Sequence, residues 1–207
     1  MTSPAWEPCA PFNPLAPGSS EEASEARDRL LLDQVHAGDQ AALQALVSAY
    51  WSPLVRYAAR IMDGIDSAED AVQEAFVRLW ERRAGWQPRR SARVLLYTMV
   101  RHLALNRRTS VATRSRLLTL HSQRMERSPA SPLELVEGLD VERAIERAIE
   151  ALPPRRREVL VLSRYHDLSR TEIAELLALS AQTVSNHLTL AITELRRSLR
   201  FHLPSHD

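Results

Sequence analysis

Residues 169–195 read SRTEIAELLALSAQTVSNHLTLAITEL and hold the sharpest local pattern of the chain. Ser169 and Glu172 have the spacing of a capping box, which predicts the start of a short apolar helix. The turn that follows ends at Ser180, which is placed to cap a longer helix. A short helix, a tight turn and a longer helix together predict a helix-turn-helix.

The first turns of the longer helix carry polar side chains that suit the edges of DNA bases. In a helix-turn-helix the N-terminal part of the second helix enters the major groove. Asn and Gln can bond bidentately to adenine, Ser and Thr can contact several bases, and nearby arginines can hold phosphates. The candidate DNA contacts are Gln182, Thr183, Ser185, Asn186, His187, Arg164, Arg170 and Arg196.

Helical periodicity also runs through the N-terminal half of the chain. Apolar residues recur at helical spacing in four segments between residues 20 and 108. The expected caps are Ser19, Asp39, Ser67 and Ser91. Pro53 lies inside the second segment and predicts a kink or a short break there. We therefore predict an all-α fold of two small helical domains joined by a flexible linker, with the helix-turn-helix in the C-terminal domain.

The amino-acid composition changes along the chain and divides it into an N-terminal extension, two domains and a linker between them. Residues 1–19 contain five prolines and no helical period, which predicts a disordered extension. Residues 20–108 form the first domain. Residues 109–138 lose the helical pattern and turn from basic to acidic, so we expect a linker there. The second domain covers residues 139–203, and Pro154 is placed in the first turn of one of its helices.

The charge distribution is uneven although the net charge is only +1. All 27 basic residues are arginine, and residues 82–124 contain no Asp or Glu. A cluster of arginines in an acid-free stretch is typical of a surface that faces phosphates. A solvated basic surface with no partner is the alternative interpretation of the same pattern.

Several classes of function are excluded by what the sequence lacks. The seven histidines are scattered, none has a metal-binding spacing, and no Gly-rich phosphate loop occurs, so we expect no enzymatic activity, no metal and no cofactor. Cys9 has no partner for a disulfide, which fits a reducing compartment. No apolar run approaches the roughly 18 residues of a membrane span, and the N-terminus does not resemble a signal peptide. We expect a cytoplasmic protein without membrane insertion.

Two motifs resemble a known family. Residues 68–80, AEDAVQEAFVRLW, resemble the most recognisable helix of region 2 in the extracytoplasmic-function (ECF) class of bacterial sigma factors. The pattern from Ala151 through Arg157-Glu158-Val159 to the helix-turn-helix resembles region 4 of the same class. The resemblance covers residues 39–203. Ala178 stands where the family usually has Gly in the turn, which would cost about 1 kcal/mol if the backbone there is left-handed.

The resemblance implies a role for each part of the chain. Region 2 would bind the β′ clamp helices of core RNA polymerase through Asp70, Gln73, Glu74, Phe76, Leu79 and Trp80. The arginine-rich block would capture the melted promoter −10 strand through Trp86, Arg89, Arg90, Tyr97, Arg101, Asn106, Arg107 and Arg108. Region 4 would bind the −35 element of promoter DNA and the β-flap of the polymerase. An anti-sigma factor is a further expected partner.

A helix-turn-helix regulator of the response-regulator or quorum type is the strongest alternative. Such proteins share the Glu-Ile-Ala, Ser-cap and Thr-Val features of residues 172–184. A receiver domain would alternate strands and helices, however, whereas residues 20–108 have a helical pattern throughout. A helical adaptor without DNA contact would leave the arginine block unexplained. The sequence therefore favours a sigma factor that binds core polymerase, recognises −10 and −35 elements and promotes melting.

Overall fold

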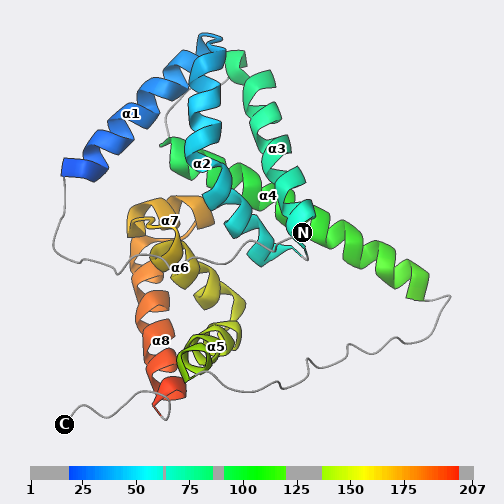
Figure 1. Ribbon diagram of the computed structural model, residues 1–207, viewed down its shortest axis with the longest axis vertical. Coiled ribbons are helices and arrows are strands. Elements are labelled where there is room, and N and C mark those ends of the chain that lie inside the picture. Colours follow the sequence, from blue (N-terminus) through cyan, green and yellow to red (C-terminus); the bar gives the residue numbers. More distant parts are fainter. Residues whose placement is uncertain (1–18, 63, 86–90, 120–136, 201–207) are drawn as a thin grey trace.

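The computed structural model describes residues 19–62, 64–85, 91–119 and 137–200. Every regular element in these ranges is a helix, which confirms the all-α prediction. The helices are α1 (Ser19–His36), α2 (Gln40–Ile61), α3 (Ile65–Glu81), the 3-10 helix η1 (Arg83–Gly85), α4 (Ala92–Thr119), α5 (Glu137–Glu150), α6 (Pro154–Tyr165), α7 (Arg170–Leu177) and α8 (Ala181–Leu199). Figure 1 shows α1–α4 at one end of the molecule and α5–α8 at the other.

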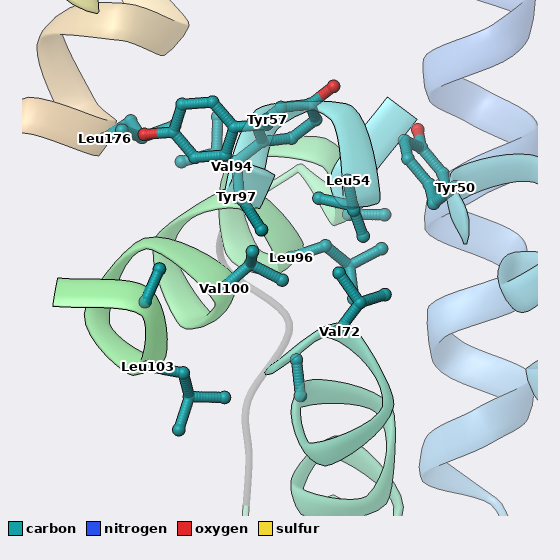
Figure 2. Packing of buried hydrophobic residues seen from close by; sticks show 14 of the residues in the cluster. Tyr50, Leu54, Tyr57, Val72, Val94, Leu96, Tyr97, Val100, Leu103 and Leu176 are labelled. Carbon is teal, nitrogen blue, oxygen red and sulfur yellow. The ribbon is translucent and has the colours of Figure 1, made fainter. Parts of the chain in front are cut away.

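The N-terminal helices pack around α2, which contacts α1, α3 and α4. Leu46, Leu54, Val72 and Leu96 are completely buried between these helices. Figure 2 shows Leu54, Val72 and Leu96 pointing toward one another from α2, α3 and α4. The apolar residues that recur at helical spacing in the sequence therefore form the core of this bundle.

The predicted helix starts of this bundle are partly correct. The Asp39 carboxylate accepts hydrogen bonds from the backbone at the start of α2, and Ser91 Oγ accepts one from Val94 N at 3.2 Å. The cap predicted at Ser67 is wrong, because Gly64 turns the chain at φ 103° and α3 begins at Ile65. α1 begins at Ser19 itself, and α2 continues through Pro53 unbroken.

The helix-turn-helix prediction is confirmed by α7 and α8. Ser169 Oγ accepts from Glu172 N at 3.2 Å while the Glu172 carboxylate accepts from Ser169 N at 2.9 Å, which completes the capping box. Ser180 Oγ accepts from Thr183 N at 3.0 Å and caps α8. Ala178 ends α7 in the left-handed conformation, at φ 54° and ψ 48°. This alanine therefore carries the strain of about 1 kcal/mol that the sequence indicated.

The two groups of helices share a buried face. α4 packs against α7, and buried residues of α6 and α7 belong to the same apolar cluster as those of α2, α3 and α4. Figure 2 shows Leu176 of α7 beside Tyr57 of α2 and Tyr97 of α4. A second cluster joins α5, α6 and α8 around Leu152, Leu160 and Ala191. The C-terminal helices thus have a core of their own and a contact with the N-terminal bundle.

The helical chain extends further than the sequence pattern indicated. α4 continues past residue 108 to Thr119, because residues 92–119 contain neither Pro nor Gly to end it. The predicted disordered extension, apart from Ser19, lies outside the described residues, as do positions 120–136 of the predicted linker and positions 201–203 of the second domain.

Candidate functional site

The first turns of α8 present two amide side chains on an exposed surface. Gln182 and Asn186 are exposed, and Gln182 Nε2 donates to Asn186 Oδ1 at 3.0 Å. This bond leaves an acceptor oxygen on Gln182 and a donor amide on Asn186. One donor beside one acceptor is the pattern that matches the N7 and N6 positions of adenine in the major groove. Buried Val184 holds this part of α8 against the core.

The other candidate DNA contacts of the C-terminal helices are either half-buried residues of α8 or exposed arginines. Thr183, Ser185 and His187 are half-buried, and the Thr183 hydroxyl lies 2.8 Å from Ser180 Oγ. Nδ1 of His187 is buried without a hydrogen-bond partner, so that edge of the ring faces the protein. The arginines Arg164, Arg170 and Arg196 are exposed. The exposed members of the set are therefore the amide pair and these cations.

The polar face of α3 has two exposed members and one that is tied to α4. Asp70 and Gln73 are exposed. Glu74 instead accepts a hydrogen bond from Arg78 and another from Arg107 Nη2 of α4, the latter at 2.7 Å. Partial burial opposes ionisation of Glu74, but the hydrogen bonds from these two arginines outweigh it and lower the pKa of the carboxyl group. Glu74 is thus ionised and holds α3 to α4.

The apolar residues assigned to the polymerase contact lie mostly in the core. Phe76 and Leu79 are buried among the helices of the N-terminal bundle. Trp80 is half-buried, and the Arg83 guanidinium lies over its ring at 4.2 Å from the centroid. Of the six residues assigned to this contact, Asp70 and Gln73 are the exposed ones.

The candidates for the −10 strand fall into three groups. Trp86, Arg89 and Arg90 lie outside the described residues. Asn106 and Arg108 are exposed on α4. The remaining three, Tyr97, Arg101 and Arg107, have protein partners.

Tyr97 and Arg101 face the C-terminal helices. The Tyr97 side chain is buried, and its hydroxyl lies 3.0 Å from Nδ1 of His166, the residue that follows α6. Arg101 forms an ion pair with Glu158 of α6, with Nε at 2.7 Å from Oε1 and Nη2 at 3.4 Å from Oε2. The Tyr57 hydroxyl of α2 donates to the same carboxylate at 3.3 Å. Tyr57, Glu158 and His166 are members of this cluster that the sequence did not single out.

Burial controls the protonation of this cluster. Burial, and after it the positive charges of Arg56, Arg60 and Arg93, together lower the pKa of His166 to about 4. Burial likewise raises the pKa of Tyr97 and Tyr57, so both hydroxyls keep their protons. Burial opposes the charge of Arg101, but the hydrogen bond and the charge of Glu158 outweigh it and raise the pKa of the guanidinium. The cluster therefore contains a neutral imidazole beside an ion pair.

The described residues hold neither a candidate metal site nor a candidate membrane span. In that part of the chain no group of three or more His, Cys, Asp or Glu side chains is arranged to hold a metal ion. None of the described helices is both long enough and apolar enough to cross a membrane.

Comparison with known proteins matches both halves of the chain. The family model "Sigma-70 region 2" matches residues 46–114, and "Sigma-70, region 4" matches residues 142–195. The ECF RNA polymerase sigma factor SigW of Bacillus subtilis is 28% identical over 178 residues, which cover 82% of this chain and 95% of that protein. SigL of Mycobacterium tuberculosis, also an ECF RNA polymerase sigma factor, is 30% identical over 165 residues, covering 79% and 92%.

Solved structures share the same fold. CnrH in complex with the cytosolic domain of CnrY matches with a TM-score of 0.61 and 23% identity, covering 84% of this chain and 98% of that one. The sigma factor RpoE in complex with the anti-sigma factor NepR from Bartonella quintana matches with a TM-score of 0.56 and 18% identity, covering 76% and 96%. At these identities the likeness establishes the two-domain helical fold.

Proposed function

Because the chain belongs to the ECF sigma factors, which direct bacterial RNA polymerase to start transcription at promoters, we propose that its two helical domains divide this work between them. The first domain, residues 20–108, binds core polymerase and the melted −10 strand. The second domain, residues 139–203, binds the −35 duplex, and residues 109–138 connect the two. The regulator of the response-regulator type is not favoured, because region 2 of sigma-70 occupies the N-terminal half instead of a receiver domain.

The observation that carries the second domain's role is the exposed amide pair at the start of α8. Gln182 and Asn186 project from the helix that a helix-turn-helix inserts into the major groove. Three exposed arginines, Arg164 in the last turn of α6, Arg170 at the start of α7 and Arg196 in the last turn of α8, supply phosphate contacts that set the register of the helix. The second domain thus offers groups for both base recognition and phosphate binding.

The first domain's docking surface is the exposed part of α3. The side chains of Asp70 and Gln73 are exposed and offer polar groups to a basic partner surface. Glu74 acts indirectly, because its bond to Arg107 fixes α3 against α4. We assign the clamp helices of the polymerase β′ subunit to this surface and the β-flap to the second domain.

The proposal also covers catalysis, localisation and regulation of the protein. The chain has no catalytic activity of its own and uses no cofactor, since the polymerase performs the chemistry. It acts in the cytoplasm, where polymerase and promoter DNA are found. An anti-sigma factor sequesters it, as the structures of the similar proteins CnrH and RpoE with their partners suggest.

The test is run-off transcription with purified bacterial core polymerase on DNA from upstream of the chain's own coding region. Discrete transcripts that require the protein would support the proposal and locate the −10 and −35 elements. If core polymerase neither co-elutes with the protein nor gives a transcript with it on any template, the proposed division of labour has no basis.

A further inference from the structure

Leu190 is an exposed apolar residue on α8, and the packing of the helix does not account for it. The apolar stripe that α8 turns toward α5, α6 and α7 consists of Val184, Leu188, Ala191, Ile192 and Leu195. Leu190 lies outside this stripe and is 46% exposed. It is the large apolar side chain of α8 that faces solvent in the part of the chain that the structure describes. A role in the core therefore does not explain its apolar character.

The position of Leu190 along α8 lies between two groups that the proposed function assigns to DNA. Residues four apart lie one above the other on a helix, so Leu190 follows Asn186 on the same face, one turn further from the N-terminus. Arg196, which is assigned to a phosphate, lies in the last turn of α8. Asn186 and Arg196 are about 15 Å apart along the helix axis. A helix that contacts DNA at both points brings Leu190 against the base edges between them.

The polar neighbours of Leu190 have already used their hydrogen-bond donors. Thr189 Oγ1 donates to Ser185 O at 3.0 Å, and Thr193 Oγ1 donates to Thr189 O at 2.8 Å. Both threonines are exposed. A hydroxyl that is bonded to the backbone of its own helix has no hydrogen left for a base. Around Leu190, α8 therefore offers apolar contact and not further donors.

We propose that Leu190 is a specificity-determining residue that contacts the C5 methyl group of a thymine in the −35 duplex. The inference rests on the proposed function, from which it takes the insertion of α8 into the major groove. Thymine is the base that presents a methyl group there, whereas the others present hydrogen-bonding groups that an alkyl side chain would leave unpaired. One turn of helix rises about 6 Å and neighbouring bases are about 3.4 Å apart, so the thymine lies about two steps from the base that Asn186 contacts.

The test removes the methyl group from the DNA and the side chain from the protein, each alone and both together. The full-length protein first selects its preferred duplex from a pool that contains a randomised stretch. The selected duplex is then made with uracil in place of each thymine in turn, because uracil pairs with adenine as thymine does and lacks only the methyl group. Fluorescence anisotropy measures the binding of each duplex to the original protein and to Leu190→Ala.

At one thymine, uracil should weaken binding to the original protein about fourfold, the loss expected for the contact of one methyl group. Leu190→Ala should bind the thymine duplex about fourfold more weakly and should not distinguish it from the uracil duplex, because the partner of the methyl group is gone. Circular dichroism confirms that the variant is folded, and its co-elution with core polymerase should be unchanged.

Leu30→Ala is the matched control for the protein variant. Leu30 is also an exposed leucine, at 57%, but it lies on α1. This variant should keep the original affinity for the thymine duplex and the full loss of affinity with uracil.

The proposal is overturned if uracil is tolerated at every thymine of the selected duplex, or if Leu190→Ala shows the same loss with uracil as the original protein. It is also overturned if Leu190→Ala loses co-elution with polymerase and keeps its DNA affinity, since Leu190 would then contact a protein. In all three cases the DNA-binding role of the second domain stands, because the protein has selected a sequence. If the protein selects no sequence, the proposed function of the second domain fails together with this inference.

Discussion

The interface between the two domains should weaken as the pH falls, and His166 is the reason. The ring is 7% exposed, and its pKa lies near 4 instead of the ordinary 6.5. Nδ1 faces the Tyr97 hydroxyl, while Nε2 is buried without a partner. Protonation places a hydrogen on both ring nitrogens, so the charged ring would bury an N–H group with nothing to accept it.

The direction and the size of this pH dependence follow from the ordinary pKa of histidine, 6.5, and the pKa of about 4 that His166 has in the folded protein. In the unfolded chain His166 has its ordinary pKa and binds a proton between pH 6.5 and about 4, whereas in the folded protein its ring stays neutral there. The contribution of His166 to the stability of the folded protein is therefore fully present above pH 6.5 and is lost as the pH falls through this window. The difference between the two pKa values corresponds to about 3 kcal/mol.

The groups that surround His166 support the same direction. Arg56 and Arg60 of α2 and Arg93 of α4 are the cations that act on the ring, and each disfavours a further positive charge. Tyr57 and Tyr97 pack against it as neutral rings, with centroids at 5.6 Å and 5.4 Å. The nearby cations and neutral hydroxyls thus leave an added charge without a counterion in direct contact.

The assay is urea unfolding across this pH window for the original protein and for His166→Phe, which keeps an aromatic ring but cannot titrate. Carboxylates titrate in both proteins, so the difference between the two curves isolates the histidine. The original protein should lose up to about 3 kcal/mol more than the variant between pH 6.5 and 4. Parallel curves for the two proteins would refute the reasoning, because the histidine would then titrate alike in the folded and unfolded states.

Three further substitutions test separate parts of the molecule. Gln182→Ala with Asn186→Ala should weaken discrimination between −35 sequences by about 1–3 kcal/mol in duplex-binding assays and leave core polymerase binding intact. Asp70→Arg with Gln73→Arg should reduce co-elution with core polymerase and leave duplex binding intact; equal defects in both pairs would contradict the division of labour. Ser169→Ala should lower the free energy of unfolding by about 1 kcal/mol in urea, because the α7 cap is lost, and an unchanged value would contradict this role.

The helix-turn-helix could be predicted because its determinants are local. Ser169 and Glu172 satisfy each other's backbone groups within one turn, and Ser180 does the same for α8. The same reasoning failed at Ser67, because Gly64 can adopt a positive φ and begin the helix earlier. Capping patterns thus identify a helix reliably where no glycine offers the chain another way to turn.

The interface could not be predicted because its partners are far apart in sequence. Tyr97 and His166 are separated by 69 residues, and Arg101 and Glu158 by 57. Periodicity assigns a residue to one face of a helix but does not say which other helix covers that face. The sequence does contain one indication of this contact. Glu158 is an acid that follows three consecutive arginines, and the acid-free block around Arg101 has to find its acidic partners elsewhere in the chain.

The position of the proposed docking surface on α3 limits the effect of a partner on the contact between the two domains. A partner shifts an equilibrium between two forms only by the difference in its affinity for them. Asp70 and Gln73 on α3 are exposed while the two domains are in contact, so a partner that binds these residues alone does not favour separation of the domains. The Asp70→Arg and Gln73→Arg pair should accordingly weaken polymerase binding without changing how compact the free protein is.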